Sequence, residues 1–247
     1  MELGPELLEA TVAFAKVLDE AKSKDQPRGG WYPYGSLDNM WHLDRLLPAD
    51  HRDLKVLTAG GPVADVGAAD GDMAYFLNSL GIPTEIIDNP PTNFNSLEGA
   101  ALLGRLLHSE VPIHSVDLDS QFTLPHGNYS LILFLGILYH LENPYYALKA
   151  MSRQSRYLLL STRIAAQTVD GQVALNKAPV AYLVDPHETN NDPTNFWIFS
   201  MPGLRRLVSR CGWEIVSELQ VGRTDGDSNP SQADRDERAF MLLRSRS

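Results

Sequence analysis

The stretch Val63-Ala64-Asp65-Val66-Gly67-Ala68-Ala69-Asp70-Gly71 decides the fold of this 247-residue chain. It reads as an apolar strand with an acidic residue near its end, followed by a turn that holds two glycines four positions apart. A helical apolar pattern over residues 73–80 comes directly after it. Such a turn places backbone N–H groups and the positive end of a helix where a ligand can approach closely. The stretch therefore indicates either a nucleotide-binding turn or a tight connection without a ligand.

Strands and helices alternate on both sides of this stretch. Strands are predicted at 63–67, 84–88, 112–117, 130–135 and 157–162, with helices at 73–80, 96–107 and 145–151 between them. Alternation of this kind indicates βαβ crossovers and a mostly parallel sheet. A helix at 202–211, strands at 214–219 and 239–243, and a polar linker at 223–238 predict an antiparallel pair at the end.

The fold class predicted is therefore α/β, with a Rossmann-like seven-stranded, mostly parallel sheet, an antiparallel final strand and an N-terminal helical addition. Helices predicted at 6–18 and 37–47 would form a helical cap over residues 1–50, and 51–247 would form the main domain. The segment 164–199 is too long for a routine connection. We predict that it is an insertion that serves as a substrate lid.

Composition bounds the functions that the chain can have. A hydrophobic content of 43% is enough for a sizeable α/β core, while a net charge of −10 disfavours a broad nucleic-acid surface. Cys211 is the single cysteine, so no intramolecular disulfide forms. No secretory leader and no 18-residue apolar run stand out. We expect a cytoplasmic protein that does not span a membrane, and a homo-oligomer stays open.

The spacing of the glycines selects among nucleotide ligands. The dinucleotide fingerprint is Gly-x-Gly-x-x-Gly, whereas Gly67 and Gly71 stand in the register Asp-x-Gly-x-x-x-Gly. This register resembles the first motif of class I S-adenosylmethionine-dependent methyltransferases. The resemblance implies S-adenosyl-L-methionine as the cofactor and a transferase activity.

Acidic residues follow the predicted strands where an open α/β sheet binds its ligand. Asp88 ends the second strand and could accept hydrogen bonds from the ribose hydroxyls, or it could only form a turn before Asn89. Asp117 and Asp119 follow the third strand; the resemblance implies that one contacts the adenine amino group, while the other caps or turns the chain. The predicted cofactor contacts from this part of the argument are Asp65, Gly67, Ala68, Gly71, Asp88, Asp117, Leu118, Leu135 and Gly136.

Two further stretches resemble the tRNA wobble-uridine carboxymethyltransferases and their relatives. They are Gly136-Ile137-Leu138-Tyr139-His140 with Asn143-Pro144, and Gly29-Gly30-Trp31-Tyr32 with the segment 40–48. The resemblance covers residues 28–243 and implies carboxy-S-adenosyl-L-methionine as the donor, held by Arg28, Tyr139 and Arg238. The chain departs from that family in having Arg28 for a lysine and Ala69 for the second glycine. Its short N-terminal extension and acidic charge favour a small-molecule acceptor over tRNA.

His140 and Tyr139 are the predicted catalytic residues. His140 could remove a proton from the acceptor, or it could only bond a neighbouring loop. Tyr139 could line the donor or acceptor, or pack in the core. No metal site is predicted, because the seven histidines are scattered singly. The predicted substrate contacts are Trp31, Tyr32, Trp41, His42, Tyr182, His187 and Trp197.

Three functions follow from this sequence. The first is a methyltransferase that acts on oxygen or nitrogen of a small molecule. The second is a tRNA wobble-uridine carboxymethyltransferase-like enzyme that uses the carboxylated donor. The third is a cofactor-binding module without transfer activity.

Overall fold

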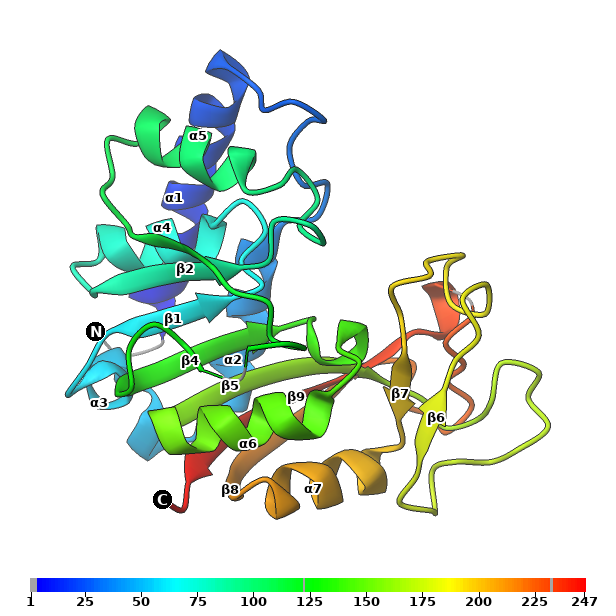
Figure 1. Cartoon of the computed structure of the whole chain (residues 1–247). Helices are drawn as coiled ribbons and strands as arrows, with labels where there is room; N and C mark the ends of the chain where they lie inside the picture. Colours follow the sequence, from blue (N-terminus) through cyan, green and yellow to red (C-terminus); the bar gives the residue numbers. More distant parts are fainter. Residues whose placement is uncertain (1–3, 122, 232) are drawn as a thin grey trace. The chain divides into compact units, whose positions relative to one another are not determined.

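The computed structural model describes residues 4–121, 123–231 and 233–247 of the chain (Figure 1). The described residues form two compact units. Unit 1 holds residues 4–117, 123–133 and 154–156, and unit 2 holds residues 118–121, 134–153 and 157–247. The helical cap and the lid are functional divisions of a different kind, and they stay predictions.

Unit 1 is a parallel sheet covered by helices. The strand order is β3-β2-β1-β4, with every pairing parallel. Helix α4 lies beside β1 and β2, and α1 contacts both α4 and α5 (Figure 1). The elements are α1 (Pro5–Lys24), α2 (Asn39–Leu46), α3 (Leu54–Thr58), β1 (Val63–Val66), α4 (Asp72–Ser79), β2 (Thr84–Asp88), α5 (Glu98–Leu106), β3 (Ile113–Ser115) and β4 (Tyr129–Leu135), whose last two residues belong to unit 2.

The core of unit 1 forms where the sequence pattern predicts it. All residues of β1 are buried, as expected of a strand covered on both faces. Helix α4 buries Met73, Phe76 and Leu77, and Phe76 is fully enclosed. The stretch that opens the sequence analysis is therefore a strand, a turn and a helix, as predicted.

The first helix is longer than predicted. Helix α1 continues to Lys24, so the prediction of a polar connection beginning at Lys22 is wrong at its start. Leu18 and Ala21 extend the apolar face that packs inward, and Lys22 forms an ion pair with Asp72 at 2.8 Å. These tertiary contacts stabilise a last turn that propensity alone leaves undecided.

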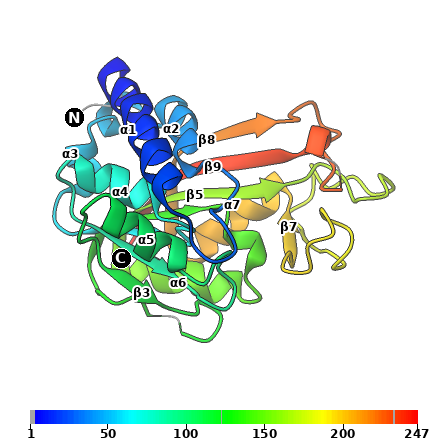
Figure 2. The ribbon, with the colours of Figure 1, turned by 90° about the horizontal axis from the view of Figure 1, so that it is seen from above.

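Unit 2 contains the antiparallel end of the sheet. Strand β9 pairs antiparallel with both β5 and β8, so the predicted antiparallel ending is confirmed (Figure 2). The polar linker between β8 and β9 includes a short 3-10 turn (Ala233–Arg235). The elements are a 3-10 turn (Leu138–His140), α6 (Pro144–Gln154), β5 (Ser155–Ile164), β6 (Ala181–Leu183), β7 (Trp197–Phe199), α7 (Met201–Arg210), β8 (Trp213–Gly222) and β9 (Glu237–Ser245). The last residue of α6 and the first two of β5 belong to unit 1.

The predicted strand number of seven is wrong, because the described residues form nine strands. The two extra strands, β6 and β7, lie within the segment 164–199 and pair antiparallel with each other, while β7 meets β5 at Ile164. Each is three residues long, too short to show the alternation that identifies a strand from sequence. Val184 and Ile198 of this segment are buried, so part of it belongs to the core.

The fold is a mixed α/β fold with a mostly parallel sheet, antiparallel strands and flanking helices, as the sequence predicts. Among the helices of the described residues, none combines the length and the apolar character needed to cross a membrane.

Candidate functional site

The glycine turn of unit 1 has an unusual backbone. Gly67, Ala69 and Gly71 all have positive φ, at 70°, 53° and 82°. A Cβ at Gly71 would lie 2.5 Å from the Ile86 side chain, so this glycine permits close packing of the turn on β2. The predicted contact of Gly71 with the cofactor stays a prediction.

Asp65 lies under this turn and is almost completely buried. Its Oδ2 accepts a hydrogen bond from the Ala74 backbone N–H at 3.1 Å, within the first turn of α4. Burial and the nearby charge of Asp88 raise the pKa of Asp65 to about 7, against the opposing effect of the Ala74 hydrogen bond. A cationic group placed beside this carboxylate would favour its ionised form.

Asp88 ends β2 and joins three parts of the chain. Its Oδ2 accepts from the Ala69 backbone N–H at 3.1 Å and from Asn93 Nδ2 at 2.9 Å, and its Oδ1 accepts from the Asn89 N–H at 2.7 Å. Asp88 therefore stabilises the turn that follows β2, which is one of its two predicted roles. Because a carboxylate offers about four lone-pair positions, these bonds leave room for a ligand hydroxyl. Burial raises the pKa of Asp88.

The structure separates the roles of Asp117 and Asp119. The Val116 backbone N–H donates to the Asp88 carbonyl at 3.0 Å, which brings the following residue, Asp117, to the same sheet edge as Asp88. In unit 2, the Asp119 carboxylate accepts from the backbone N–H groups of Glu142 and Asn143 at 3.0 and 2.7 Å. Asp119 is therefore the residue that holds a turn, and Asp117 stays the predicted adenine contact.

Asp70 has a positioning role that the sequence does not reveal. It is 2% exposed, and its carboxylate accepts from the Tyr32 backbone N–H and from Asn95 Nδ2, both at 2.7 Å. Asn95 also donates to the Gly30 carbonyl at 3.2 Å. These bonds fasten the N-terminal segment and the loop after β2 to the glycine turn. They join residues 25 to 65 positions apart, so no local pattern could predict them.

Three aromatic rings gather on the segments that Asp70 holds. The Tyr32 ring lies 5.4 Å from that of Tyr34 and 5.8 Å from that of Phe94, in edge-to-face geometry. Tyr34 is 71% exposed and Phe94 is 52% exposed. We call these rings the aromatic platform; only Tyr32 was predicted as a substrate contact. The side chains that flank Phe94 are bonded inward, Asn93 to Asp88 and Asn95 to Asp70.

The other predicted residues of the N-terminal part have different surroundings. The Trp31 indole N–H donates to the carbonyls of Lys22 and Asp25, so it closes the loop after α1. Trp41 is 48% exposed on α2, whose opposite face carries buried residues, and His42 is partly buried beside it. All three stay predicted substrate contacts.

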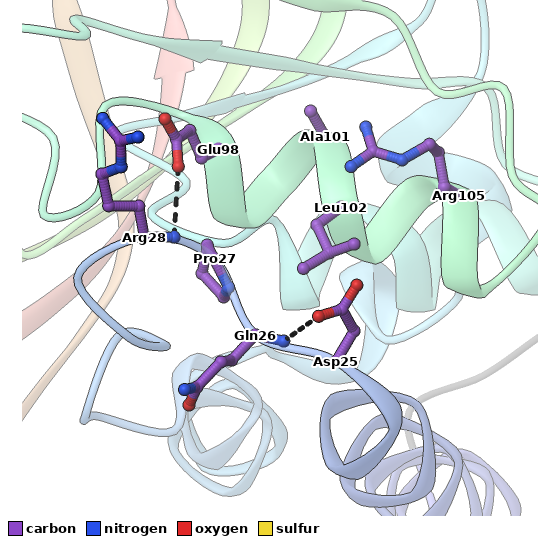
Figure 3. Close-up of a pocket in the computed structure, with 8 residues that line it drawn as sticks. All are labelled: Asp25, Gln26, Pro27, Arg28, Glu98, Ala101, Leu102 and Arg105. Carbon is purple, nitrogen blue, oxygen red and sulfur yellow. Dashed lines mark hydrogen bonds between the residues drawn. The ribbon is translucent and has the colours of Figure 1, made fainter.

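Arg28 lies at a surface hollow beside α5 (Figure 3). Its backbone N–H donates to Glu98 Oε2 at 3.1 Å, and Arg105 stands at the other end of the hollow. The hollow has a volume of about 280 Å³. Its lining residues are Asp25, Gln26, Pro27, Arg28, Glu98, Ala101, Leu102 and Arg105. The role of Arg28 in donor binding stays a prediction.

Unit 2 brings Gly136, Tyr139 and Arg238 together. The Arg238 guanidinium lies over the Tyr139 ring, 6.0 Å from its centroid. A Cβ at Gly136 would lie 3.8 Å from both Arg238 Nη1 and the Tyr139 hydroxyl. Tyr139 is also buried among core residues, so the packing interpretation is observed as well.

A second arginine shares the counter-ion of Arg238. Arg163 is buried, and its Nε donates to Asp236 Oδ1 at 2.6 Å, while Arg238 Nε donates to Asp236 Oδ2 at 3.2 Å. Two guanidinium groups against one carboxylate leave an excess positive charge. Burial opposes the charge on Arg238, but Tyr139 and Asp236 outweigh it and hold the pKa of the guanidinium above its usual value.

His140 ends the 3-10 turn after β4. Its Nδ1 lies 3.1 Å from the Thr194 carbonyl and 2.9 Å from Thr194 Oγ1. Burial lowers the pKa of the imidazole, and the charges of Arg163 and Arg238 lower it further. The hydrogen bond to a loop is therefore observed, and the catalytic role stays a prediction.

The remaining predicted residues of unit 2 are distributed over its loops and strands. The Tyr182 hydroxyl donates to Glu188, with 2.8 Å to each carboxylate oxygen, and the Trp197 indole N–H donates weakly to the Glu142 carbonyl at 3.4 Å. His187 is exposed, with Nδ1 2.8 Å from Asn191 Oδ1. Leu118 is buried, and Leu135 is partly buried where β4 ends.

The side chains of the two units suit different kinds of ligand group. In unit 1, carboxylates at neighbouring strand ends suit hydroxyls, an amino group and a positive charge. In unit 2, the arginine beside Tyr139 suits a carboxylate. Within the ranges that the structure describes, no group of three or more His, Cys, Asp or Glu side chains is placed to hold a metal ion.

Comparisons with known proteins define the fold class. No family model and no curated protein match the chain. The N-terminal domain of EvdMO1 with SAH bound is similar in structure at 18% identity, with 94% of this chain and 97% of that one covered and a TM-score of 0.54. The [4+2]-cyclase SpnF is similar at 14% identity, with 94% of this chain and 92% of that one covered and a TM-score of 0.55. A SAM-dependent methyltransferase from Archaeoglobus fulgidus is similar at 13% identity, with 78% of this chain and 90% of that one covered and a TM-score of 0.51. At such identities the likeness shows the fold, a Rossmann-like α/β fold found in SAM-dependent methyltransferases.

Proposed function

We propose that this chain is an S-adenosyl-L-methionine-dependent methyltransferase that acts on oxygen or nitrogen of a small molecule. One observation carries the proposal: Asp88 joins the glycine turn to the end of β2, and Asp117 follows the neighbouring strand at the same edge. Ligands of open α/β sheets bind at this edge. The similar structures, which include a domain with SAH bound and a SAM-dependent methyltransferase, support the same assignment.

The roles of the residues follow from their chemistry. Asp88 would accept hydrogen bonds from the ribose hydroxyls, and Asp117 would accept one from the adenine amino group. The buried carboxylate of Asp65 would stabilise positive charge on the amino acid part. When bound, the donor supplies a methyl group made electrophilic by a sulfonium. Because methyl transfer is an in-line displacement, alignment of the two reactants supplies much of the catalysis.

Three observations favour a small-molecule acceptor over tRNA. The net charge of −10 disfavours a phosphate-binding surface, because phosphate contacts need Lys and Arg. The aromatic platform offers exposed rings on a segment held by hydrogen bonds, which suits an apolar or planar face of a small molecule. One structure of the EvdMO1 N-terminal domain was determined in the presence of SAH and D-fucose, which also supports a small acceptor.

Calorimetry with S-adenosylmethionine and S-adenosylhomocysteine tests the proposal directly. We expect both to bind with micromolar dissociation constants. An absence of binding at millimolar ligand would overturn the assignment. Donor binding without turnover across a broad acceptor screen would instead favour the cofactor-binding module.

The pair of Arg238 and Tyr139 supports a second candidate, a transferase that uses the carboxylated donor. A guanidinium with its pKa held high, next to a phenol, is a suitable partner for a carboxylate. Mass spectrometry of donor that co-purifies with the protein separates the two candidates. A donor with the mass of S-adenosylmethionine supports the first, and one heavier by a carboxyl group supports the second.

A further inference from the structure

The hydrogen bonds of His140 fix the position of its proton. Nδ1 lies 3.1 Å from the carbonyl oxygen of Thr194, and a carbonyl can only accept. Nδ1 must therefore carry the proton. The second contact agrees, because Thr194 Oγ1 donates its own proton to Asp192 Oδ1 at 2.6 Å and so accepts from Nδ1 at 2.9 Å.

Asp192 holds the loop that makes these contacts. Its Oδ1 accepts from both the backbone N–H and the hydroxyl of Thr194, at 2.9 and 2.6 Å. Hydrogen bonds thus run in series from His140 Nδ1 to the Thr194 hydroxyl and from that hydroxyl to the Asp192 carboxylate. A ring that only fills space would not need this order.

A neutral imidazole with its proton on Nδ1 carries a lone pair and no proton on Nε2. The charged groups that act on His140 are Asp192, which raises its pKa, and Arg163 and Arg238, which lower it; the Tyr139 ring lies 4.3 Å from its centroid. Burial adds to the arginines. The neutral ring therefore predominates at neutral pH, where Nε2 can accept a proton.

We propose that Thr194 and Asp192 are positioning residues that hold His140 as the Nδ1–H tautomer, so that Nε2 accepts the proton of the acceptor during methyl transfer. This inference rests on the proposed function. The acceptor oxygen or nitrogen forms a bond to the methyl carbon, the carbon–sulfur bond breaks, and the sulfur leaves with that electron pair as a neutral thioether. The acceptor proton passes to Nε2, and the positive charge of the sulfonium thereby ends on the imidazolium. Asp192 offsets that charge through Thr194.

Nitrogen NMR of the imidazole tests the tautomer on the full chain without any acceptor. We expect wild-type His140 to show a protonated Nδ1 and an unprotonated Nε2. Asp192→Asn keeps an oxygen that accepts both Thr194 bonds but removes the charge. Its His140 should keep the tautomer and titrate at lower pH, by about half a pH unit. The exposed His108 of unit 1 serves as the internal reference and should not move.

Asp192→Ala removes both hydrogen bonds from Asp192 to Thr194 and should give a mixture of His140 tautomers. An Nε2–H tautomer in the wild type, or an Asp192→Asn protein whose His140 titration does not move, would overturn the inference. Circular dichroism of each variant separates these outcomes from unfolding. Failure of the proposed function appears differently, as absent donor binding in calorimetry with the tautomer intact.

Turnover of an acceptor found by screening tests the proton transfer itself. The rate should fall as pH drops through the pKa of His140, because the protonated ring cannot accept a proton. That acidic limb should move to lower pH in Asp192→Asn, while Asp192→Ala should lower the plateau of kcat about 10-fold with KM for the donor unchanged. A plateau equal to wild type in Asp192→Ala would assign the loop a purely structural role.

Discussion

The two units present opposite chemistry. Unit 1 carries the carboxylates Asp65, Asp70 and Asp88 at and beside its glycine turn, whereas unit 2 carries Arg163 and Arg238. In unit 1 the acids bond backbone and amide N–H groups, while in unit 2 the arginines share a single carboxylate. The difference indicates that unit 1 suits hydroxyls and cations, whereas unit 2 suits anions.

Burial favours the neutral form of a titratable group in both units. It raises the pKa of Asp65 and lowers the pKa of His140, because a low dielectric disfavours the charged form of each. Burial therefore favours the neutral acid in unit 1 and the neutral base in unit 2. The following experiments test this contrast, from the largest expected effect to the smallest.

Asp65→Asn should remove a pH dependence of stability that unit 1 imposes. The folded pKa of about 7 lies above the usual unfolded value, so the native state binds this proton more tightly and loses stability as pH rises from about 4 to about 7. The variant should gain up to about 4 kcal/mol over wild type at pH 8 and nothing at pH 3. Denaturant unfolding across this pH range measures the gain. A variant that is less stable at pH 8 would show that the carboxylate is needed as an ion.

Gly71→Ala should destabilise the protein by about 3 kcal/mol, because a methyl group at a left-handed position would meet Ile86. Gly60→Ala is the matched control: Gly60 also has positive φ, at 98°, but nothing lies within 4 Å of its Cβ position. The control should lose about 1 kcal/mol. Urea unfolding of both variants gives the difference, and equal losses would mean that packing on β2 costs nothing.

Asp88→Ala should weaken binding of S-adenosylmethionine about 30-fold, equivalent to about 2 kcal/mol. It removes the ribose acceptor and the anchor of Ala69 and Asn93. Asp53→Ala is the control, because Asp53 also accepts a backbone N–H in unit 1, from Lys55 at the start of α3. Calorimetry should find donor affinity unchanged in the control. An unchanged affinity in Asp88→Ala would remove this acid from the proposed site.

Arg238→Ala should change the affinity for S-adenosylmethionine by less than about 3-fold if the donor is not carboxylated. The same variant should lose at least about 10-fold in affinity for the carboxylated donor if Arg238 binds its carboxylate. Competition between the two donors on wild type and variant measures both values. Equal losses for the two donors would show that Arg238 acts through packing on Tyr139 instead.

Local patterns predicted the elements that are long or strongly periodic. Strand β2 was predicted at its observed bounds, and α4, α5 and α7 within two residues. The three-residue strands β6 and β7 were not predicted, because the alternation of apolar and polar residues that identifies a strand needs a longer segment. The prediction of α1 is too short, because tertiary contacts stabilise its last turn, among them the ion pair of Lys22 with Asp72.

The sequence by itself determined the βαβ alternation, the glycine turn and the acids at the strand ends, since each depends on residues close together in the chain. Only the tertiary structure decided what those residues touch. Asp70 reaches Tyr32 across 38 positions, His140 reaches Thr194 across 54, and Arg163 reaches Asp236 across 73. Such contacts form because burial forces each polar group to find a partner, and the fold rather than the local sequence chooses which one.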